Sequence, residues 1–177
     1  MKKILVVFIS ILILMPEVKS STTSASSYIL MDQNTGRVLL SKDKDSQRLI
    51  ASITKIMTCI LALESGKSED VVIVDDNATS AYGSGIYIEV GEEIKLKDLL
   101  YGLMLRSGND AASMIAAYVS GSVEEFVKLM NNKAKELDMK NTIFYTPSGL
   151  PTPHGNLSSV YDMAILNRYA MQNKEYR

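Results

Sequence analysis

Hydrophobic and polar positions change period along this chain, and the change predicts a mixture of strands and helices. Apolar runs at 28–31 and 37–40 flank the polar segment 32–36, in which Gly36 is available for a positive φ. That pattern is typical of a β-hairpin. A third apolar run at 71–74, bounded by polar residues, predicts a further strand.

Apolar residues recur at helical spacing through most of the remaining chain. The first such segment covers about residues 52–65. Ser122 and Glu125 form a capping box that opens another helix, which reaches about Leu137. Three more helices are expected at 96–105, 110–118 and 160–171. With no internal repeat and no interdomain linker, these elements predict one domain of the α/β (α+β) class.

The first twenty residues have the layout of a secretory signal peptide. Lys2 and Lys3 precede an apolar run over 4–15, and Pro16 interrupts it. The stretch 18–20 then offers small residues at the usual recognition positions for cleavage. The run is shorter than the about 20 residues that a membrane-spanning helix needs. We therefore expect a signal peptide at 1–20, a domain at 21–177, and export to the extracytoplasmic side of the membrane.

Composition excludes several classes of function. The chain has 177 residues, of which 46% are hydrophobic, and a formal net charge of −1, so no basic surface indicates a nucleic-acid partner. One histidine and one cysteine cannot form a structural zinc set, and a disulfide framework is excluded. We expect no metal and no cofactor. The cysteine and three methionines are read as core residues: Cys59, Met57, Met104 and Met114.

The strongest candidate chemistry is Ser52-Ile53-Thr54-Lys55 at the head of an apolar helix. A serine hydroxyl needs an adjacent base to act as a nucleophile, and residues three apart share a helix face, so the amine of Lys55 would lie beside Ser52. A helix N-terminus adds a positive dipole, and the Ser52 N–H could stabilise an oxyanion. For Lys55 to act as a base at neutral pH, burial or a neighbouring positive charge must keep its amine partly deprotonated.

Two other arrangements are weaker. Ser41 and Lys44 repeat the Ser-x-x-Lys spacing, but they stand in a charged turn where nothing would lower a lysine pKa. A Ser-His-Asp triad would have to use His154, which lies in a loop rich in proline and glycine and is more simply a solvated residue. Spacing alone is weak evidence, so the apolar helix behind Ser52 decides between them.

A second polar element, Ser107-Gly108-Asn109, interrupts two apolar helices. It permits two readings that the residues alone leave evenly balanced. One is a simple connection between helices with a polar cap. The other is a functional wall, in which Ser107 relays a proton to the leaving group and the amide of Asn109 holds the substrate backbone.

Ser-x-x-Lys followed by Ser-x-Asn resembles the active-site pattern of penicillin-binding proteins and serine β-lactamases. The segments 51–58, 99–112 and 144–150 are similar to the low-molecular-weight serine-type D-alanyl-D-alanine carboxypeptidases. The resemblance implies a penicillin-binding/β-lactamase-like transpeptidase fold, with a helical cluster on an antiparallel sheet, in a bacterial cell-wall enzyme. It implies peptidoglycan stem peptides ending in D-Ala-D-Ala as substrate and β-lactam antibiotics as covalent inhibitors. By this resemblance Ser52 is the nucleophile and Lys55 its general base. Ser107 is a further catalytic residue, and Gly108 and Asn109 bind the substrate.

The chain departs from the family in one respect, because it contains no Lys-Thr-Gly. In the family that motif lies on a strand at the opposite edge of the cleft and belongs to C-terminal strands that complete the sheet. We therefore expect an incomplete domain of doubtful activity, with the hairpin 28–40 left as a two-stranded ribbon with an unpaired edge. A β-lactamase-like hydrolase is an alternative, although 136–141 lacks the Glu-x-x-x-Asn spacing. A catalytically inactive wall-binding remnant is the other alternative.

Overall fold

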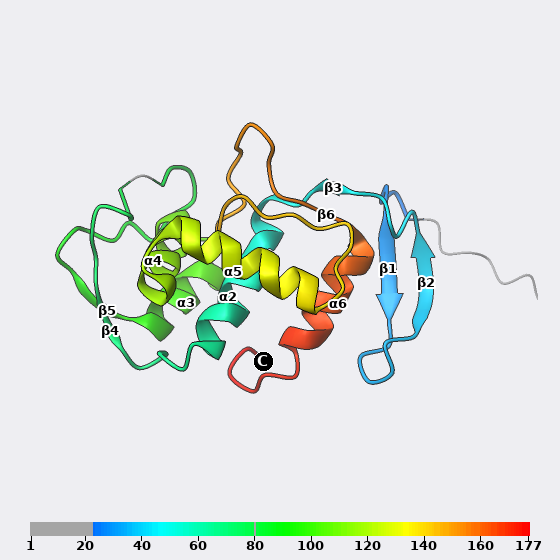
Figure 1. Ribbon diagram of the computed structural model, residues 1–177, viewed down its shortest axis with the longest axis horizontal. Coiled ribbons are helices and arrows are strands. Elements are labelled where there is room, and N and C mark those ends of the chain that lie inside the picture. The colour runs from blue at the N-terminus through cyan, green and yellow to red at the C-terminus, as the bar shows by residue number, and fades with distance from the viewer. Residues whose placement is uncertain (1–22, 80) are drawn as a thin grey trace, which may run out of the picture.

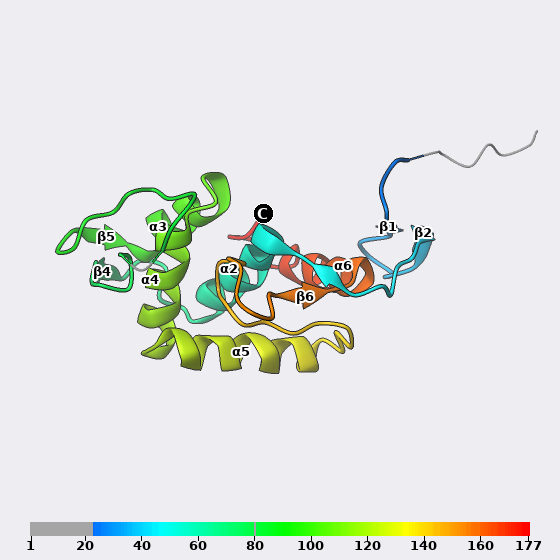
Figure 2. The same ribbon diagram turned by 90° about the horizontal axis from the view of Figure 1, so that it is seen from above.

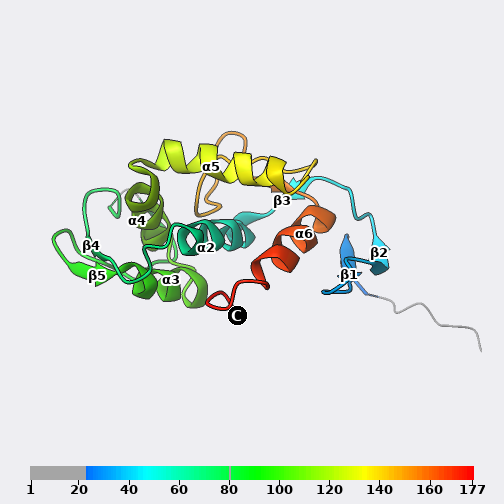
Figure 3. The same ribbon diagram turned by 60° about the horizontal axis from the view of Figure 1, so that its bottom comes forward.

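The molecule is organised around one central helix, α2 (Lys55–Glu64). The computed structural model describes residues 23–79 and 81–177. Helix α2 contacts the four other α-helices found within these described residues, with α5 on one side of it and α3 on the other (Figure 3). These neighbours are α3 (Leu96–Leu105), α4 (Asn109–Ser120), α5 (Val123–Glu136) and α6 (Val160–Ala170). All five helices lie close to the expected ranges.

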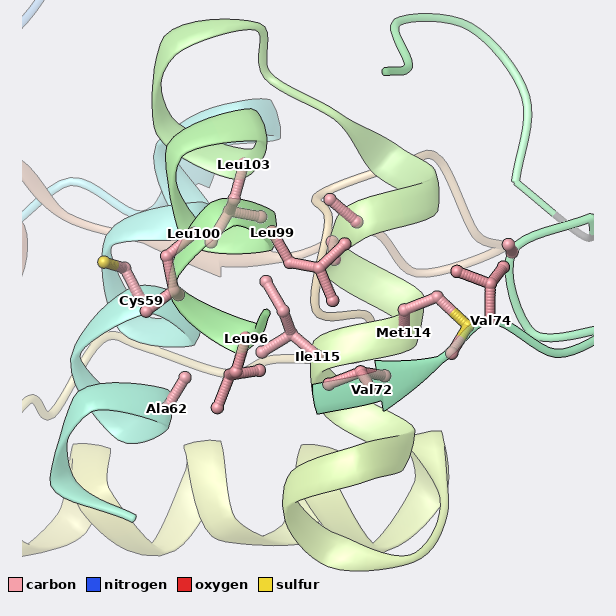
Figure 4. Close-up of a cluster of buried hydrophobic side chains, with 13 residues drawn as sticks. Cys59, Ala62, Val72, Val74, Leu96, Leu99, Leu100, Leu103, Met114 and Ile115 are labelled. Carbon is pink, nitrogen blue, oxygen red and sulfur yellow. The ribbon is translucent and has the colours of Figure 1, made fainter. Parts of the chain in front are cut away.

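One hydrophobic cluster lies between α2, α3 and α4 (Figure 4). Helix α3 buries one apolar stripe at helical spacing against Ile115 of α4; the stripe consists of Leu96, Leu99, Leu100 and Leu103. Cys59 and Met114 also lie in this cluster, as expected. Met104 was also expected in the core, but it is 40% exposed, so that prediction is wrong. It follows Leu103 by one position and therefore falls beside the buried stripe.

A second cluster joins α2 to α5 and α6. Met57 of α2, another expected core residue, is fully buried there together with Phe126 of α5 and Leu166 of α6. Phe144, from the segment that follows α5, completes the cluster and is also buried. Because α2 packs into both clusters, its place in the molecule is fixed, and so is the place of the residues just before its first turn.

The expected hairpin is present as β1 (Tyr28–Met31) paired antiparallel with β2 (Val38–Lys42), and Gly36 in its turn has a φ of +74°. It forms a two-stranded sheet at one end of the molecule (Figures 1 and 2). Arg168 of α6 fastens this turn, donating to the backbone oxygens of Gln33 and Asn34. Several apolar side chains of the hairpin remain exposed: Leu30, Leu39 and Leu40.

Two smaller ladders complete the strands. The expected strand is β4 (Val71–Ile73), and it pairs with β5 (Glu93–Lys95), whose polar sequence gave no strand signal. β3 (Arg48–Leu49) pairs with β6 (Leu157–Ser158), and neither was expected. The β3–β6 ladder matters for the site, because it brings the chain before α2 beside a segment about a hundred positions further on.

The polypeptide enters α2 through a 3₁₀ helix, Ala51–Thr54. The sequence predicted an α-helix from Ser52, whereas the α-helix begins at Lys55. The reason is a tighter turn, in which the Ile53 N–H donates to the Ile50 carbonyl at 3.1 Å. Ala51 has a φ of +43°, a conformation that a residue with a side chain adopts only under constraint.

Residues 1–20, the predicted signal peptide, lie outside the described part of the chain. Among the described residues, no helix has both the length and the apolar character needed to cross a membrane.

Gly149, in the loop that precedes β6, packs closely against the 3₁₀ helix. Its φ is +82°, and a Cβ at this position would lie 1.9 Å from the Ala51 carbonyl oxygen. We expect Gly149→Ala to lower the free energy of unfolding by about 3 kcal/mol, because backbone strain adds to overpacking. Denaturant unfolding followed by circular dichroism measures this loss.

Gly121→Ala is the matched control, since Gly121 has a φ of +86° and nothing within 4 Å of the added Cβ. Only the backbone strain applies there, so a loss of about 1 kcal/mol is expected. Equal losses in the two variants would contradict the close packing of Gly149 against Ala51.

Candidate active site

Ser52 stands in the 3₁₀ helix, directly after the strained Ala51, and is exposed. Its hydroxyl lies 3.2 Å from the Nζ of Lys55 and 3.1 Å from the Oγ of Ser107. An exposed serine that contacts an amine and a second hydroxyl has the arrangement expected of an activated nucleophile.

Lys55 is the first residue of α2, and its side chain is almost completely buried, with 3% of the residue exposed. The Nζ donates to the Oδ1 of Asn109 and to the backbone oxygen of Ser148, both at 2.8 Å, as well as to Ser52. Three oxygens from three separate segments therefore surround the amine. None of these oxygens carries a formal charge.

Burial lowers the pKa of Lys55 from 10.5 to about 8, because the ammonium loses hydration and gains no carboxylate partner. The geometry gives the two protonation states different roles. An ammonium has three donors for the three oxygens. A neutral amine has two donors, which Asn109 and Ser148 can take, and its lone pair then faces the hydroxyl of Ser52. The network therefore suits a lysine that accepts the proton of Ser52.

The Ser107-Gly108-Asn109 element forms the turn between α3 and α4, and Ser107 has a φ of +56°. The Oγ of Ser107 donates to Ser52. The side chain of Asn109 is engaged at both ends, since its Nδ2 donates to the Tyr82 carbonyl at 2.7 Å and its Oδ1 accepts from Lys55. The element therefore faces Ser52 and Lys55 directly, which a simple connection between helices would not require.

Gly108, predicted to bind substrate with Asn109, is buried within the turn. Its N–H donates to the Gly102 carbonyl at 3.1 Å. A Cβ at Gly108 would lie 3.0 Å from the Oδ1 of Asp110 and 3.2 Å from the Cβ of Ala111, so the position is tightly packed. The substrate-binding roles of Gly108 and Asn109 stay predictions.

Sequence reasoning missed Asp110, which follows Asn109 in the first turn of α4. Its buried carboxylate accepts from the N–H groups of Ile86 and Tyr87, the latter at 2.7 Å. It therefore fastens the loop before β5 to the Ser-x-Asn turn. An acidic residue in the first turn of a helix was the available signal.

The other missed feature is the role of the Ser148 carbonyl, which the loop 145–150 supplies to Lys55. Thr58, one turn along α2, donates its hydroxyl to the Pro147 carbonyl at 2.6 Å and holds the same loop. A backbone oxygen leaves no signature of residue type. The proline and glycine content of the segment indicated only a loop.

The weaker sequence candidates do not form comparable sites. Lys44 pairs with Asp45 at 2.7 Å, and Ser41 is exposed on β2. His154 is exposed, and its ring centroid lies 5.3 Å from that of Tyr145. Within residues 23–79 and 81–177, no group of three or more histidine, cysteine or acidic side chains is arranged to hold a metal ion.

Comparison with solved structures defines the class of fold. Penicillin binding protein 6B from Escherichia coli is 35% identical with a TM-score of 0.83, covering 89% of this chain and 53% of that one. A D-alanyl-D-alanine carboxypeptidase from Mycobacterium tuberculosis is 33% identical with a TM-score of 0.82, covering 86% and 58%. The expected penicillin-binding fold is therefore confirmed.

The family follows from the sequence comparison. The family model described as D-alanyl-D-alanine carboxypeptidase, Peptidase_S11, matches residues 15–177. The chain belongs to this family. D-alanyl-D-alanine carboxypeptidase DacF of Bacillus subtilis is 48% identical over 147 residues, which are 80% of this chain and 38% of that protein. The chain thus spans about two fifths of the length of such relatives.

The state of the buried amine gives a direct prediction. The Cε resonance of Lys55, assigned by its loss in Lys55→Arg, should titrate with a midpoint near pH 8, because burial lowers the pKa. Lys97 serves as the internal reference, since its contact with Glu69 raises its pKa above 10.5. An NMR titration from pH 6 to pH 11 measures both. A Lys55 midpoint at or above 10.5 would contradict the buried, uncharged surroundings described here.

Proposed function

We propose that this chain carries the nucleophile, base and Ser-x-Asn wall of a serine-type D-alanyl-D-alanine carboxypeptidase. The substrate class is a peptidoglycan stem peptide that ends in D-Ala-D-Ala. The observation that carries the proposal is the position of the Ser52 hydroxyl, which contacts both the buried amine of Lys55 and the hydroxyl of Ser107. Membership of the family and the shared fold support it.

In the acylation step, the Ser52 Oγ attacks the carbonyl carbon of the penultimate D-alanine, and its proton passes to the neutral amine of Lys55. The bond between this carbon and the nitrogen of the terminal D-alanine then breaks. The departing nitrogen takes a proton from the Ser107 hydroxyl, and the proton that Lys55 took from Ser52 restores that hydroxyl. The products are free D-alanine and an ester on Ser52. General base and nucleophilic catalysis are therefore divided between two side chains.

In the deacylation step, a water molecule attacks the ester carbon and gives one proton to Lys55. The bond to the Ser52 Oγ breaks, and this oxygen recovers the proton. The peptide leaves with one D-alanine at its end, and the site returns to its starting state. A β-lactam would acylate Ser52 through the same first step, and because ring opening leaves the departing nitrogen attached, the ester would persist.

The β-lactamase alternative requires a further group that activates water for rapid deacylation. Glu136, in the segment considered for that role, forms an ion pair with Lys133 at 2.9 Å and is largely exposed. Neither residue is among the hydrogen-bond partners described for Ser52 or Lys55. The carboxypeptidase reading is therefore favoured over a β-lactamase, and the inactive remnant is separated from both by experiment.

We also propose that the protein acts outside the cytoplasm, with residues 1–20 removed on export. The support is the charged start, apolar run and small residues of this segment. N-terminal sequencing of the protein secreted from a bacterial host should give a chain that begins at Ser21. A product that retains Met1 would contradict the proposal.

The nucleophile assignment predicts a covalent adduct. After incubation with benzylpenicillin, the chain should gain the mass of one inhibitor molecule, as measured by intact-mass spectrometry. The rate should fall about tenfold for each pH unit well below the Lys55 pKa of about 8, because only the neutral amine accepts the proton. Above that pH the rate should level off.

Ser52→Ala is the control for the adduct and should remain unmodified, whereas Ser41→Ala should react like the parent. Adduct formation on Ser52→Ala would place the nucleophile elsewhere. A parent chain that gains no mass and is unfolded by circular dichroism would support the expected incomplete domain. A parent that folds but gains no mass would favour the inactive remnant, and a parent that hydrolyses penicillin rapidly would favour the β-lactamase.

A further inference from the structure

A buried side chain outside the predicted catalytic set connects the nucleophile turn to the loop that faces it. Asn156 is 2% exposed, and its Nδ2 donates to the Oγ1 of Thr54 at 2.9 Å and to the Thr146 carbonyl at 2.8 Å. Its Oδ1 accepts from the N–H groups of Tyr145 and Thr146. Both donors and both acceptor sites of the amide are occupied. We call Thr54, Thr146 and Asn156 the asparagine clamp.

The backbone next to the clamp is fixed on both sides. The Ile50 N–H donates to the Asn156 carbonyl at 3.1 Å, which continues the β3–β6 ladder up to the nucleophile turn. The hydroxyl of Thr146 accepts from the Gly149 N–H at 3.0 Å, which closes the loop on itself. The clamp therefore lies between two segments that already have little freedom to move.

The asparagine clamp reaches Lys55 from two directions. Thr54 is the residue before Lys55, and Thr146 stands two residues before Ser148, whose carbonyl accepts from the Lys55 amine. One amide therefore sets the distance between the backbone that carries the base and the backbone that carries one of its acceptors. A shift of the loop would move the Ser148 carbonyl away from the amine.

That carbonyl has a defined task when the amine is neutral. Asn109 and Ser148 take the two N–H groups, so the lone pair faces the Ser52 hydroxyl. Without the Ser148 carbonyl, the amine could rotate and point an N–H at Ser52 instead. Proton transfer from Ser52 depends on this orientation, and misplacement of a reacting group by about 1 Å can cost about a hundredfold in rate.

We propose that Asn156, acting through Thr54 and Thr146, is a positioning residue that holds the Ser148 carbonyl where it orients the amine of Lys55 toward Ser52. The inference rests on the proposed roles of Ser52 and Lys55. Asn156 touches neither side chain in the hydrogen bonds described, so it acts through the loop.

The test compares Thr54→Val with Thr54→Ser in the full chain. Thr54 is fully buried, valine keeps its shape without the acceptor for Asn156, and serine keeps the hydroxyl. Benzylpenicillin acylation is followed by intact mass, and the rate constant is separated from the fraction of chains that react. We expect a rate constant about tenfold lower in Thr54→Val and within about threefold of the parent in Thr54→Ser. Adding Asn156→Ala to Thr54→Val should lower it little more than Asn156→Ala alone.

Asn131→Ala is the control for a merely structural role. Asn131 anchors the same stretch of chain further upstream, donating to the Phe144 carbonyl at 2.8 Å and accepting from the Phe144 N–H at 2.9 Å. We expect a lower melting temperature and a smaller reacting fraction, with an unchanged rate constant. If Thr54→Val shows only this behaviour, the positioning role is overturned.

A second readout does not depend on chemistry at Ser52. The NMR titration midpoint of Lys55 should rise toward 10.5 in Thr54→Val, because a displaced loop admits water to the amine, and it should stay near the parent value in Thr54→Ser and Asn131→Ala. A parent that is never acylated, with a midpoint that moves only in Thr54→Val, would refute the proposed function and leave the clamp standing. Equal midpoints and equal rates in the valine and serine variants would refute the clamp.

Discussion

The burial of one lysine amine constrains the rest of this structure. A buried amine loses the water that would hydrate it, so it needs oxygen atoms of the protein as hydrogen-bond partners instead. Lys55 finds them in the nucleophile turn, in the turn between α3 and α4, and in the loop before β6, through Ser52, Asn109 and the Ser148 carbonyl. Two hydrophobic clusters on either side of α2 bring these three segments together. The packing of the helices therefore determines which oxygen atoms surround the amine of Lys55.

Strain in the backbone accompanies this convergence. Ala51 and Ser107 have φ values of +43° and +56°, and each such conformation costs about 1 kcal/mol or more. The two residues are neighbours of the chemistry, since one precedes the Ser52 nucleophile and the other donates to it. Contacts that hold them include the close approach of Gly149 to the Ala51 carbonyl. Tertiary packing thus holds Ala51 and Ser107 at positive φ values, although their backbones would be more stable at negative ones.

Much of this could be predicted from sequence where the signal is local. Helix faces, the hairpin turn and the residues of the two short motifs were predictable, because their spacing reflects contacts within one element. Met104 was misplaced because an apolar residue beside a buried stripe looks the same as one within it. The bond from Asn156 to Thr54 was not predictable, because the two residues lie 102 positions apart. The bond from Lys55 to the Ser148 carbonyl was not predictable either, because it spans 93 positions and ends on a backbone atom. The two-residue strands β3 and β6 exist only through their pairing.

The hairpin stands apart from this network in a physical sense. No hydrogen bond described for Lys55, Ser107 or Asn109 uses an atom of β1 or β2. The hairpin is fastened to α6 through Arg168, while Leu30 and Leu39 each keep more than half of their surface exposed. A two-stranded ribbon of this kind contributes little stability by itself. Because the site is assembled by the segments around α2, its geometry depends on the helical packing and the β3–β6 ladder. Loss of order in the hairpin would therefore leave the partners of Lys55 in place.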